Sequence, residues 1–382
     1  MRSYIDLSKD EEVHALALHK ESIIIDASIV PFIHYVGEDI WIDDVIKGGV
    51  TATNATVCMH RNLSDAAHEL AEYHGWIEKH EEKALLVLRA SDIEKAKREG
   101  KHGIIFGPQD SSFLEGNIRF LDTAWNWGVR IIQICYSNRN EAADGCSERT
   151  DAGLSNFGVA LIEAMNKRGM LVDLSHVGDR STMEVIEISG DPVAFTHACP
   201  RASTPQDDSP YAVWASAQGD TPYGLRGRDQ EDIDLPLQTG KWFNEFARRR
   251  GKTDEALQAC AEKGGVIGIT PFFAKKAEPS MLTDDTLDQV DYTVDLVGVD
   301  HVGFGSDLDF RNTVTRTAYI HIYPDRIDRT YHTPMTKEWG YGWLEHMPNF
   351  TKGLVARGYS DAEAKKILGL NFLKLFRRVW GD

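Results

Sequence analysis

The sequence predicts an α/β fold of the (β/α)8 or TIM-barrel type, closed into a single barrel. Eight short apolar segments recur along the 382 residues, and their polar endings are Asp26/Ser28, Asn54, Gln109, Tyr136, His176, His197, Thr270 and Asp307. In such a barrel, side chains fill the interior and chemistry sits at the carboxyl ends of the strands, so these endings mark candidate site positions. The predicted strands are Ile23–Asp26, Val50–Val57, Gly103–Gly107, Arg130–Tyr136, Met170–His176, Pro192–His197, Gly265–Thr270 and His301–Asp307.

The segments are rich in β-branched residues and nearly continuous in apolar character, as expected where helices cover the outside of a sheet and side chains fill its inside. Helical patterns lie between them. Ser155 is an expected N-cap for a helix that runs to Arg168 and ends at Gly169. Thr253 opens a further helix, and Ser360–Glu363 is a capping box before a terminal helix.

Two connections are unusually long for a compact domain, at about 201–252 after the sixth strand and at about 310–349 after the eighth. Loops longer than about 15 residues are usually functional. In a barrel, both segments would rise over the catalytic face, and many barrels exceed the roughly 250 residues of a simple one. We therefore expect one domain over residues 1–382, with these segments as lids or walls.

The composition excludes several classes of protein. With 59 acidic and 42 basic residues the formal net charge is −17, which argues against nucleic-acid binding because that ligand needs clustered cations. Five scattered cysteines form no C-x-x-C pair and indicate neither a disulfide framework nor a zinc ribbon. No apolar run approaches about 18 residues, and the first residues lack an apolar leader. We expect a cytoplasmic protein with a small-molecule substrate and no membrane contact, and we leave homo-oligomer formation open.

Two histidines, His176 and His197, end consecutive predicted strands, and Asp307 ends the eighth. Imidazoles can hold a dication and a carboxylate can take a proton from bound water, so this arrangement is typical of a metal-dependent hydrolase. A carboxylate at the end of an apolar strand is costly unless it is paired or ligated. The alternative for Asp307 is an ion pair with a neighbouring arginine, such as Arg139 or Arg311.

Further motifs occur in one order along nearly the whole chain: Gly128–Gln133, Asp151–Gly158, Val172–Val177, Gly264–Gly268, Gly303–Asp307, Pro348–Thr351 and Leu370–Phe372. On these motifs, the chain resembles the membrane dipeptidase (renal dipeptidase) family of zinc peptidases. The resemblance implies a (β/α)8 barrel with a two-zinc site that cleaves dipeptides and related amides.

The resemblance assigns His176 and His197 to the two histidine ligands of the family's second metal, and Asp307 to the acidic residue that ends the family's last strand. Other positions depart from the pattern. Where the family has Asp-Gly-His-Asn-Asp, which supplies a histidine and an aspartate to the first metal, this chain has Asp26–Val30. Gln109 stands in place of the glutamate that bridges the two metals.

These departures predict one metal ion. Two dications about 3.5–4 Å apart repel strongly, and a neutral glutamine amide does not offset that charge as a bridging carboxylate does. We expect one zinc ion on His176 and His197, with Gln109 or Asp307 completing the set, since three protein ligands and a water make a catalytic zinc site. A site without metal is the alternative.

The family's substrate contacts are also altered. Tyr136 replaces a substrate-contacting histidine of the fourth strand, and the stretches Tyr136–Asn140 and Asp144–Cys146 resemble a bacterial branch of the family. Asn54 and Asn138, together with Tyr136 and the Gln109 amide, would form a hydrogen-bonding floor at the place of the first metal. The alternative is a merely solvated space.

The family grips the substrate carboxylate with an arginine after the sixth strand, a task suited to a bidentate guanidinium. Arg228 and Arg250 each match part of that pattern, and Arg250 fits the following helix better. The alternative for Arg248–Arg250 is a solvated basic run.

The sequence thus predicts a dipeptidase-like, metal-dependent amide hydrolase in which one metal polarises the carbonyl, a bound water attacks and Asp307 acts as general base. Two alternatives stay open. One is a repurposed barrel enzyme, a lyase or a hydrolase of another small acid, in which Tyr136 and Asp307 act as acid and base without metal. The other is a ligand-binding homologue without turnover.

Overall fold

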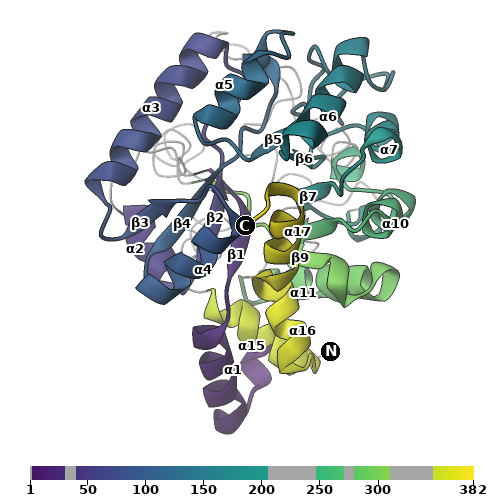
Figure 1. Ribbon diagram of the computed structural model, residues 1–382. Coiled ribbons are helices and arrows are strands. Elements are labelled where there is room, and N and C mark those ends of the chain that lie inside the picture. The colour runs from purple at the N-terminus through teal and green to yellow at the C-terminus, as the bar shows by residue number, and fades with distance from the viewer. Residues whose placement is uncertain (1, 31–39, 205–246, 271–278, 310–346) are drawn as a thin grey trace, which may run out of the picture.

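The computed structural model describes residues 2–30, 40–204, 247–270, 279–309 and 347–382. Most of the expected insertion and of the expected loop after the eighth strand, with Arg228 and Arg311, lies outside these residues. Short strands occupy the middle of the molecule and helices lie around them (Figure 1).

Every one of the eight predicted strands overlaps an observed strand, and two short strands, β3 and β10, were not predicted. The prediction ended the first strand at Asp26, but that side chain is fully buried and the strand continues to Val30. The strands are β1 (Ile25–Val30), β2 (Ala52–Ala55), β3 (Ala84–Leu86), β4 (His102–Phe106), β5 (Ile131–Gln133), β6 (Leu171–Asp173), β7 (Ala194–Ala198), β8 (Val266–Ile269), β9 (Val302–Phe304) and β10 (Leu308–Asp309).

The three helix starts that the sequence signals predicted are observed. Ser155 Oγ accepts the Gly158 N–H at the start of α6, and Gly169 ends that helix with a φ of 78°. Thr253 caps α10, and the capping box at Ser360 opens α16. The α-helices are α1 (Lys9–Glu21), α2 (Ile40–Lys47), α3 (Leu63–Lys79), α4 (Ala90–Glu99), α5 (Phe120–Asn126), α6 (Asn156–Arg168), α7 (Asp179–Ile188), α10 (Asp254–Glu262), α11 (Pro279–Val297), α15 (Pro348–Arg357), α16 (Asp361–Lys365) and α17 (Asn371–Trp380). In the described part of the chain, no helix combines the length and the apolar character that a membrane span requires.

The strands form two parallel sheets of five strands each, instead of the one closed ladder that the sequence predicted. The first sheet has the order β10-β1-β2-β4-β3 and the second sheet the order β5-β6-β7-β8-β9. At one junction, β3 occupies the edge of β4 from His102 to Ile104. The chain before β5 therefore joins β4 only at Phe106, through an isolated bridge to Val129.

At the other junction the chain passes from the second sheet to the first within a few residues. β9 pairs with β8, whereas β10, just beyond Asp307, pairs with β1. Asp307 lies at the break with a φ of 55°, and its N–H donates to the Ser28 carbonyl at 2.7 Å. This contact brings the carboxyl ends of β9 and β1 together, so the two sheets form the halves of a barrel-type arrangement whose ladder is interrupted twice.

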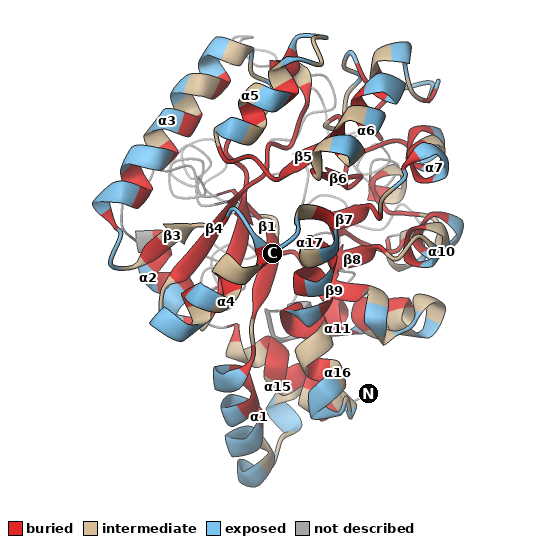
Figure 2. Cartoon of the chain, viewed as in Figure 1, coloured by how far each residue is buried: buried red, intermediate tan, exposed pale blue. Residues whose placement is uncertain are grey.

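Helix α17 closes the amino ends of the strands. Its Phe372 and Phe376 belong to one buried apolar cluster with residues at the strand starts, such as Ile25, Ile131 and Val266. Figure 2 shows most of the strands buried, with β3 partly intermediate, whereas the surrounding helices expose their outer sides. The opposite, carboxyl ends of the strands carry the polar side chains described next.

Candidate metal centre

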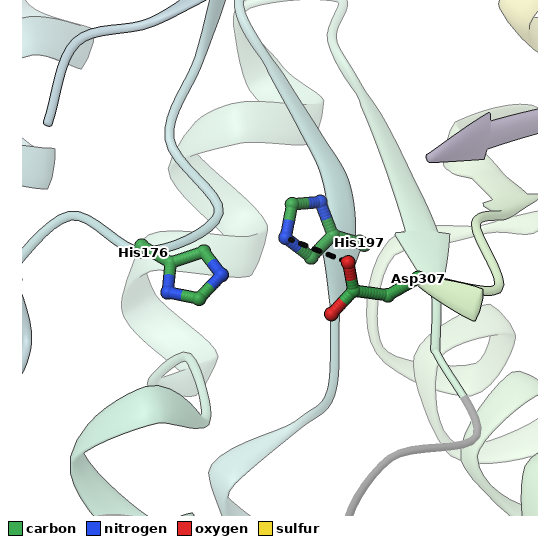
Figure 3. A group of neighbouring side chains, drawn as sticks. All are labelled: His176, His197 and Asp307. Carbon is green, nitrogen blue, oxygen red and sulfur yellow. Dashed lines mark ion pairs between the residues drawn. The ribbon is translucent and has the colours of Figure 1, made fainter. Parts of the chain in front are cut away.

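Three side chains expected to act together lie together at the carboxyl ends of their strands. His176 follows β6, His197 lies in β7 and Asp307 lies between β9 and β10. Their ligand atoms all lie within 4.8 Å of one another, and no other group of three or more histidine, cysteine or acidic side chains in the described residues has this spacing. Figure 3 shows the carboxylate beside the two rings, with Asp307 Oδ1 3.7 Å from His197 Nε2.

Hydrogen bonds fix the His197 ring on the side away from Asp307. The Thr196 hydroxyl donates to Asp173 Oδ2 at 2.6 Å and lies 2.8 Å from His197 Nδ1. Because the hydroxyl gives its single proton to the carboxylate, it accepts a bond from Nδ1–H, which leaves the ring's lone pair at Nε2. Asp173 is itself held by the Ser175 hydroxyl at 2.6 Å. The network therefore presents Nε2 of His197 as a ligand atom.

His176 is held by the loop after β5. Its Nδ1 lies 2.8 Å from the Ser137 hydroxyl, and its ring stacks on Tyr136 with the centroids 4.0 Å apart and the planes at 21°. The Cys146 N–H binds the His176 carbonyl at 2.8 Å. Ring and backbone are thus both anchored, and Nε2 is the ring nitrogen left for a ligand.

Both imidazoles are buried, and burial keeps both rings in the neutral form. Nε2 of His176 and of His197 is buried and has no hydrogen-bond partner among the described residues. Burial, and next the charge of Arg250, lowers the pKa of both rings well below the ordinary value, so both are neutral at pH 7. Metal binding requires the neutral ring, and an unpartnered buried nitrogen is costly. Two such nitrogens beside a carboxylate therefore fit a metal ion, and zinc takes these ligand types.

Asp307 is held by donors from the first sheet. The Ser28 hydroxyl donates to Asp307 Oδ1 at 3.5 Å, and Gln109 Nε2 lies 3.4 Å from that oxygen and 3.2 Å from the hydroxyl. Gln109 was expected to offer a metal ligand. In the structure its amide nitrogen, which has no lone pair for a metal, points at Ser28 and Asp307.

The expected place of a first metal holds neutral hydrogen-bonding groups. Asn54 Nδ2 donates to the Ala27 carbonyl at 2.9 Å, and a Cβ on Gly107 would lie 1.9 Å from Asn54 Oδ1, so the amide needs the glycine. Asp26, the acidic group nearest in sequence, accepts the N–H of Ser306 at 2.8 Å and that of Ser28 at 3.2 Å. Its oxygen Oδ1 is therefore committed to the backbone.

Comparison with known proteins gives the family of this chain. Residues 17–209 and 246–320 match the family described as "Membrane dipeptidase (Peptidase family M19)". The chain belongs to this membrane dipeptidase family. Two related fungal proteins are the dipeptidase tcpJ of Claviceps purpurea, 21% identical over 324 residues, and the dipeptidase verJ of Clonostachys rogersoniana, 24% identical over 323 residues. Both matches cover 84% of this chain, but they cover only 61% and 66% of the relatives' own lengths.

Solved structures confirm the TIM-barrel-type fold. An amidohydrolase from Pseudomonas aeruginosa has a TM-score of 0.72 at 28% sequence identity, and the match covers 96% of this chain and 99% of that one. A metallopeptidase from Rhodobacter sphaeroides, solved with a phosphinate mimic of the dipeptide L-Ala-D-Ala, has a TM-score of 0.66 at 16% identity, covering 94% of this chain and 100% of that one. The second likeness shows the fold alone.

Of the two arginines expected to grip a carboxylate in this membrane dipeptidase homologue, Arg250 is described. Its guanidinium is buried and donates to the carbonyls of Ser175 and His197 at the ends of β6 and β7. Lys252, also buried, donates to the Val177 carbonyl at 2.6 Å. Arg250 and Lys252 thus hold the backbone that carries His176 and His197, and these contacts do not involve a substrate.

The remaining expected residues are less closely tied to the family's metal centre. Tyr136 lies against His176, as described above, whereas no hydrogen bond joins Asn138 to the described part of the site. Sequence reasoning missed the supporting residues Asp173, Thr196 and Ser137. An acidic residue inside the apolar run at 170–174 was the available signal, because a buried carboxylate needs donors.

Proposed function

We propose that this chain is a dipeptidase-like hydrolase that cleaves a dipeptide or a related small amide with one zinc ion. His176 and His197 would hold the ion through Nε2, and Asp307 would complete the set. The observation that supports this proposal is the convergence of two unpartnered, buried imidazole nitrogens on one carboxylate. Neutral rings and an ionised carboxylate are the protonation states that metal binding requires.

The reaction adds water across the amide bond: oxygen goes to the carbonyl carbon and a proton goes to the departing nitrogen. A bound metal would supply Lewis-acid polarisation of the carbonyl and a lowered pKa of water. The Asp307 oxygen that does not bind the metal would take the proton from the attacking water and return it to the amine as the C–N bond breaks. Ser28 and Gln109 would orient the carboxylate for both transfers.

One metal is favoured over two by the side chains of the first sheet. Ser28, Asn54 and Gln109 offer hydroxyl and amide groups, which do not offset the repulsion between two dications as a bridging carboxylate does. The one acidic side chain described there, Asp26, has its Oδ1 bound by the N–H groups of Ser306 and Ser28, and its buried Oδ2 has no hydrogen-bond partner among the described residues. A cytoplasmic location stays a prediction from the sequence.

A second candidate is a reaction without metal in which Tyr136 and Asp307 act as acid and base. The stacking of Tyr136 on His176 favours it, because it places the phenol at the same strand ends as the carboxylate. The two candidates differ in their response to chelation, since a metal-free reaction is insensitive to it.

The experiment compares the parent, His176→Ala and His68→Ala for zinc content and for turnover of a panel of dipeptides. His68 lies exposed on α3 and pairs with Glu72, so it is a matched control for the loss of a histidine. We expect His176→Ala to lose both bound zinc and turnover, and His68→Ala to keep both. Full turnover by the chelated parent would exclude the metal mechanism and favour the second candidate.

A further inference from the structure

The loop between β5 and α6 contacts His176 at two points. The Ser137 hydroxyl lies 2.8 Å from the ring nitrogen Nδ1, and the Cys146 N–H donates to the His176 carbonyl at 2.8 Å. These two residues belong to one folded-back segment, because the Ser147 N–H donates to the Ser137 carbonyl at 2.8 Å. The two halves of the segment lie so close that a Cβ on Gly145 would be 2.3 Å from the Ser137 carbonyl oxygen. The ring and the backbone of His176 therefore both depend on how this loop is folded.

An ion pair connects the two sides of this loop. Arg139 binds both carboxylate oxygens of Asp144: Nε donates to Oδ1, and Nη2 donates to Oδ2 at 2.8 Å. The Asp144 side chain is 3% exposed, and a buried carboxylate that loses its cationic partner is costly. Oδ2 also accepts the Ala152 N–H at 2.6 Å, and Nη2 of Arg139 donates to the Thr150 carbonyl at 3.2 Å. Arg139, which the sequence offered as a partner for Asp307, thus pairs with Asp144 instead.

Asp144 also joins the loop to the chain beyond His176. Its carbonyl accepts the Gly178 N–H at 2.9 Å, and the next residue, Gly145, forms an isolated antiparallel bridge with Val177. The buried carboxylate thus belongs to a residue that is bonded to the backbone two positions after His176. A displacement of Asp144 would therefore shift the loop and the His176 backbone together.

We propose that Arg139 and Asp144 are positioning residues for the metal ligand His176. They act through Ser137 and Cys146, and they keep the ring in the one orientation and the one tautomer that present its ligand atom to the ion. A guanidinium that binds both oxygens of a carboxylate fixes geometry as well as charge. Residues that orient a ligand without touching the ion are worth about 10–100-fold in metal affinity. The inference rests on the proposed metal centre, and it adds two residues that set its affinity.

The test uses Arg139→Gln, because the Arg139 side chain is 53% exposed and its loss leaves no cavity in the core. Zinc affinity is measured by competition with a chelator, and the His176 ring is followed in the metal-free protein by nitrogen NMR, with His176→Ala to identify its signals. We expect zinc affinity to fall about tenfold, and the single ring tautomer of the parent to become a mixture of two. Arg180→Gln is the matched control, because Arg180 pairs with Glu184 at 2.8 Å on the surface of α7. It should keep the parent's affinity and tautomer.

A lower Tm of Arg139→Gln with unchanged zinc affinity and an unchanged ring tautomer would overturn the positioning role, because the ion pair would then support the loop alone. Asp144→Asn and the double variant add a second check: residues that act as a unit lose no more affinity together than the larger single loss, and an additive loss would contradict the pair. The two hypotheses fail in different ways. A parent that binds no zinc contradicts the proposed metal centre, whereas the His176 signals of the metal-free proteins still decide the role of Arg139.

Discussion

The two sheets bring different chemistry to one site. The second sheet supplies His176 and His197, neutral rings with unpartnered Nε2 atoms, supported from behind by hydroxyls. The first sheet supplies Ser28, Asn54 and Gln109, whose hydroxyl and amides bond to one another, to the backbone or to Asp307. The second sheet thus supplies two ligand atoms for a metal ion, whereas the first sheet orients the Asp307 carboxylate.

Asp307 belongs to both halves, because it lies where β9 leaves the second sheet and β10 joins the first. This position explains its left-handed backbone: the chain turns there to change its strand partner. The comparison teaches that an interruption in the strand ladder can place a proton acceptor opposite two ligands. The predictions below test the two halves and the residue between them.

Removing the charge of Asp307 should have the largest effect on turnover. Asp307→Asn keeps the size of the side chain and loses the proton acceptor, and general-base catalysis is worth about 10²–10⁴-fold. We expect kcat at saturating zinc to fall by about that factor, while thermal unfolding shows a folded protein. An unchanged kcat would assign the proton transfer to another group.

The support behind His197 is the next test, on the second sheet. Thr196→Val removes the hydroxyl between Asp173 and Nδ1, and such supporting contacts are worth about 10–100-fold in metal affinity. Zinc affinity, measured by competition with a chelator, should fall by that amount. Thr293→Val is the control, because the Thr293 hydroxyl is also buried but bonds to the Gln289 carbonyl within α11. Equal affinities in both variants would contradict the role of Thr196.

A smaller effect is expected on the first sheet. Gln109→Ala removes a donor to Asp307 and should lower kcat about tenfold, as expected for one hydrogen bond of about 1–1.5 kcal/mol. The zinc content should stay at the parent value, because the amide nitrogen is not a ligand. If the variant loses its zinc, Gln109 is a ligand after all and the contrast between the sheets is wrong at this position.

The smallest expected effect concerns stability and pH. Burial raises the pKa of Asp26 from 3.8 to about 7, so the folded chain holds this proton more tightly than the unfolded chain does. The stability contributed by the protonated group is present below about pH 4 and is lost as the pH rises toward 7. The Tm of Asp26→Asn should therefore exceed that of the parent by more at pH 8 than at pH 5. A shift of a few degrees is expected for a chain of this size, and an equal difference at both pH values would show that Asp26 stays ionised.

Much of the fold could be predicted because each main strand is a continuous apolar run that ends on a polar or small residue. The strand β10 could not, because a segment of two residues carries no such pattern, whereas β3 lies in the apolar run Ala84–Leu88, which was not assigned to a strand. The break between the sheets depends on which strand pairs with the edge of β4, and that is decided by tertiary contacts rather than by local sequence.

The candidate site could be predicted in its residues but not in their orientation. His176, His197 and Asp307 could be predicted from their places at strand ends, because the carboxyl ends of parallel strands lie at one edge of the sheet. Whether the nitrogen or the oxygen of the Gln109 amide faces Asp307 depends on its contact with Ser28, which lies 81 positions away in the sequence.

The most direct test of the account is the number of zinc ions per chain, measured by elemental analysis of protein that has been stripped of metal, reloaded with excess zinc and desalted. The account predicts one ion per chain in the parent and none in the double variant His176→Ala/His197→Ala. Two ions per chain in the parent would contradict it, because the first sheet would then hold a metal on groups that are described here as hydrogen-bonding supports.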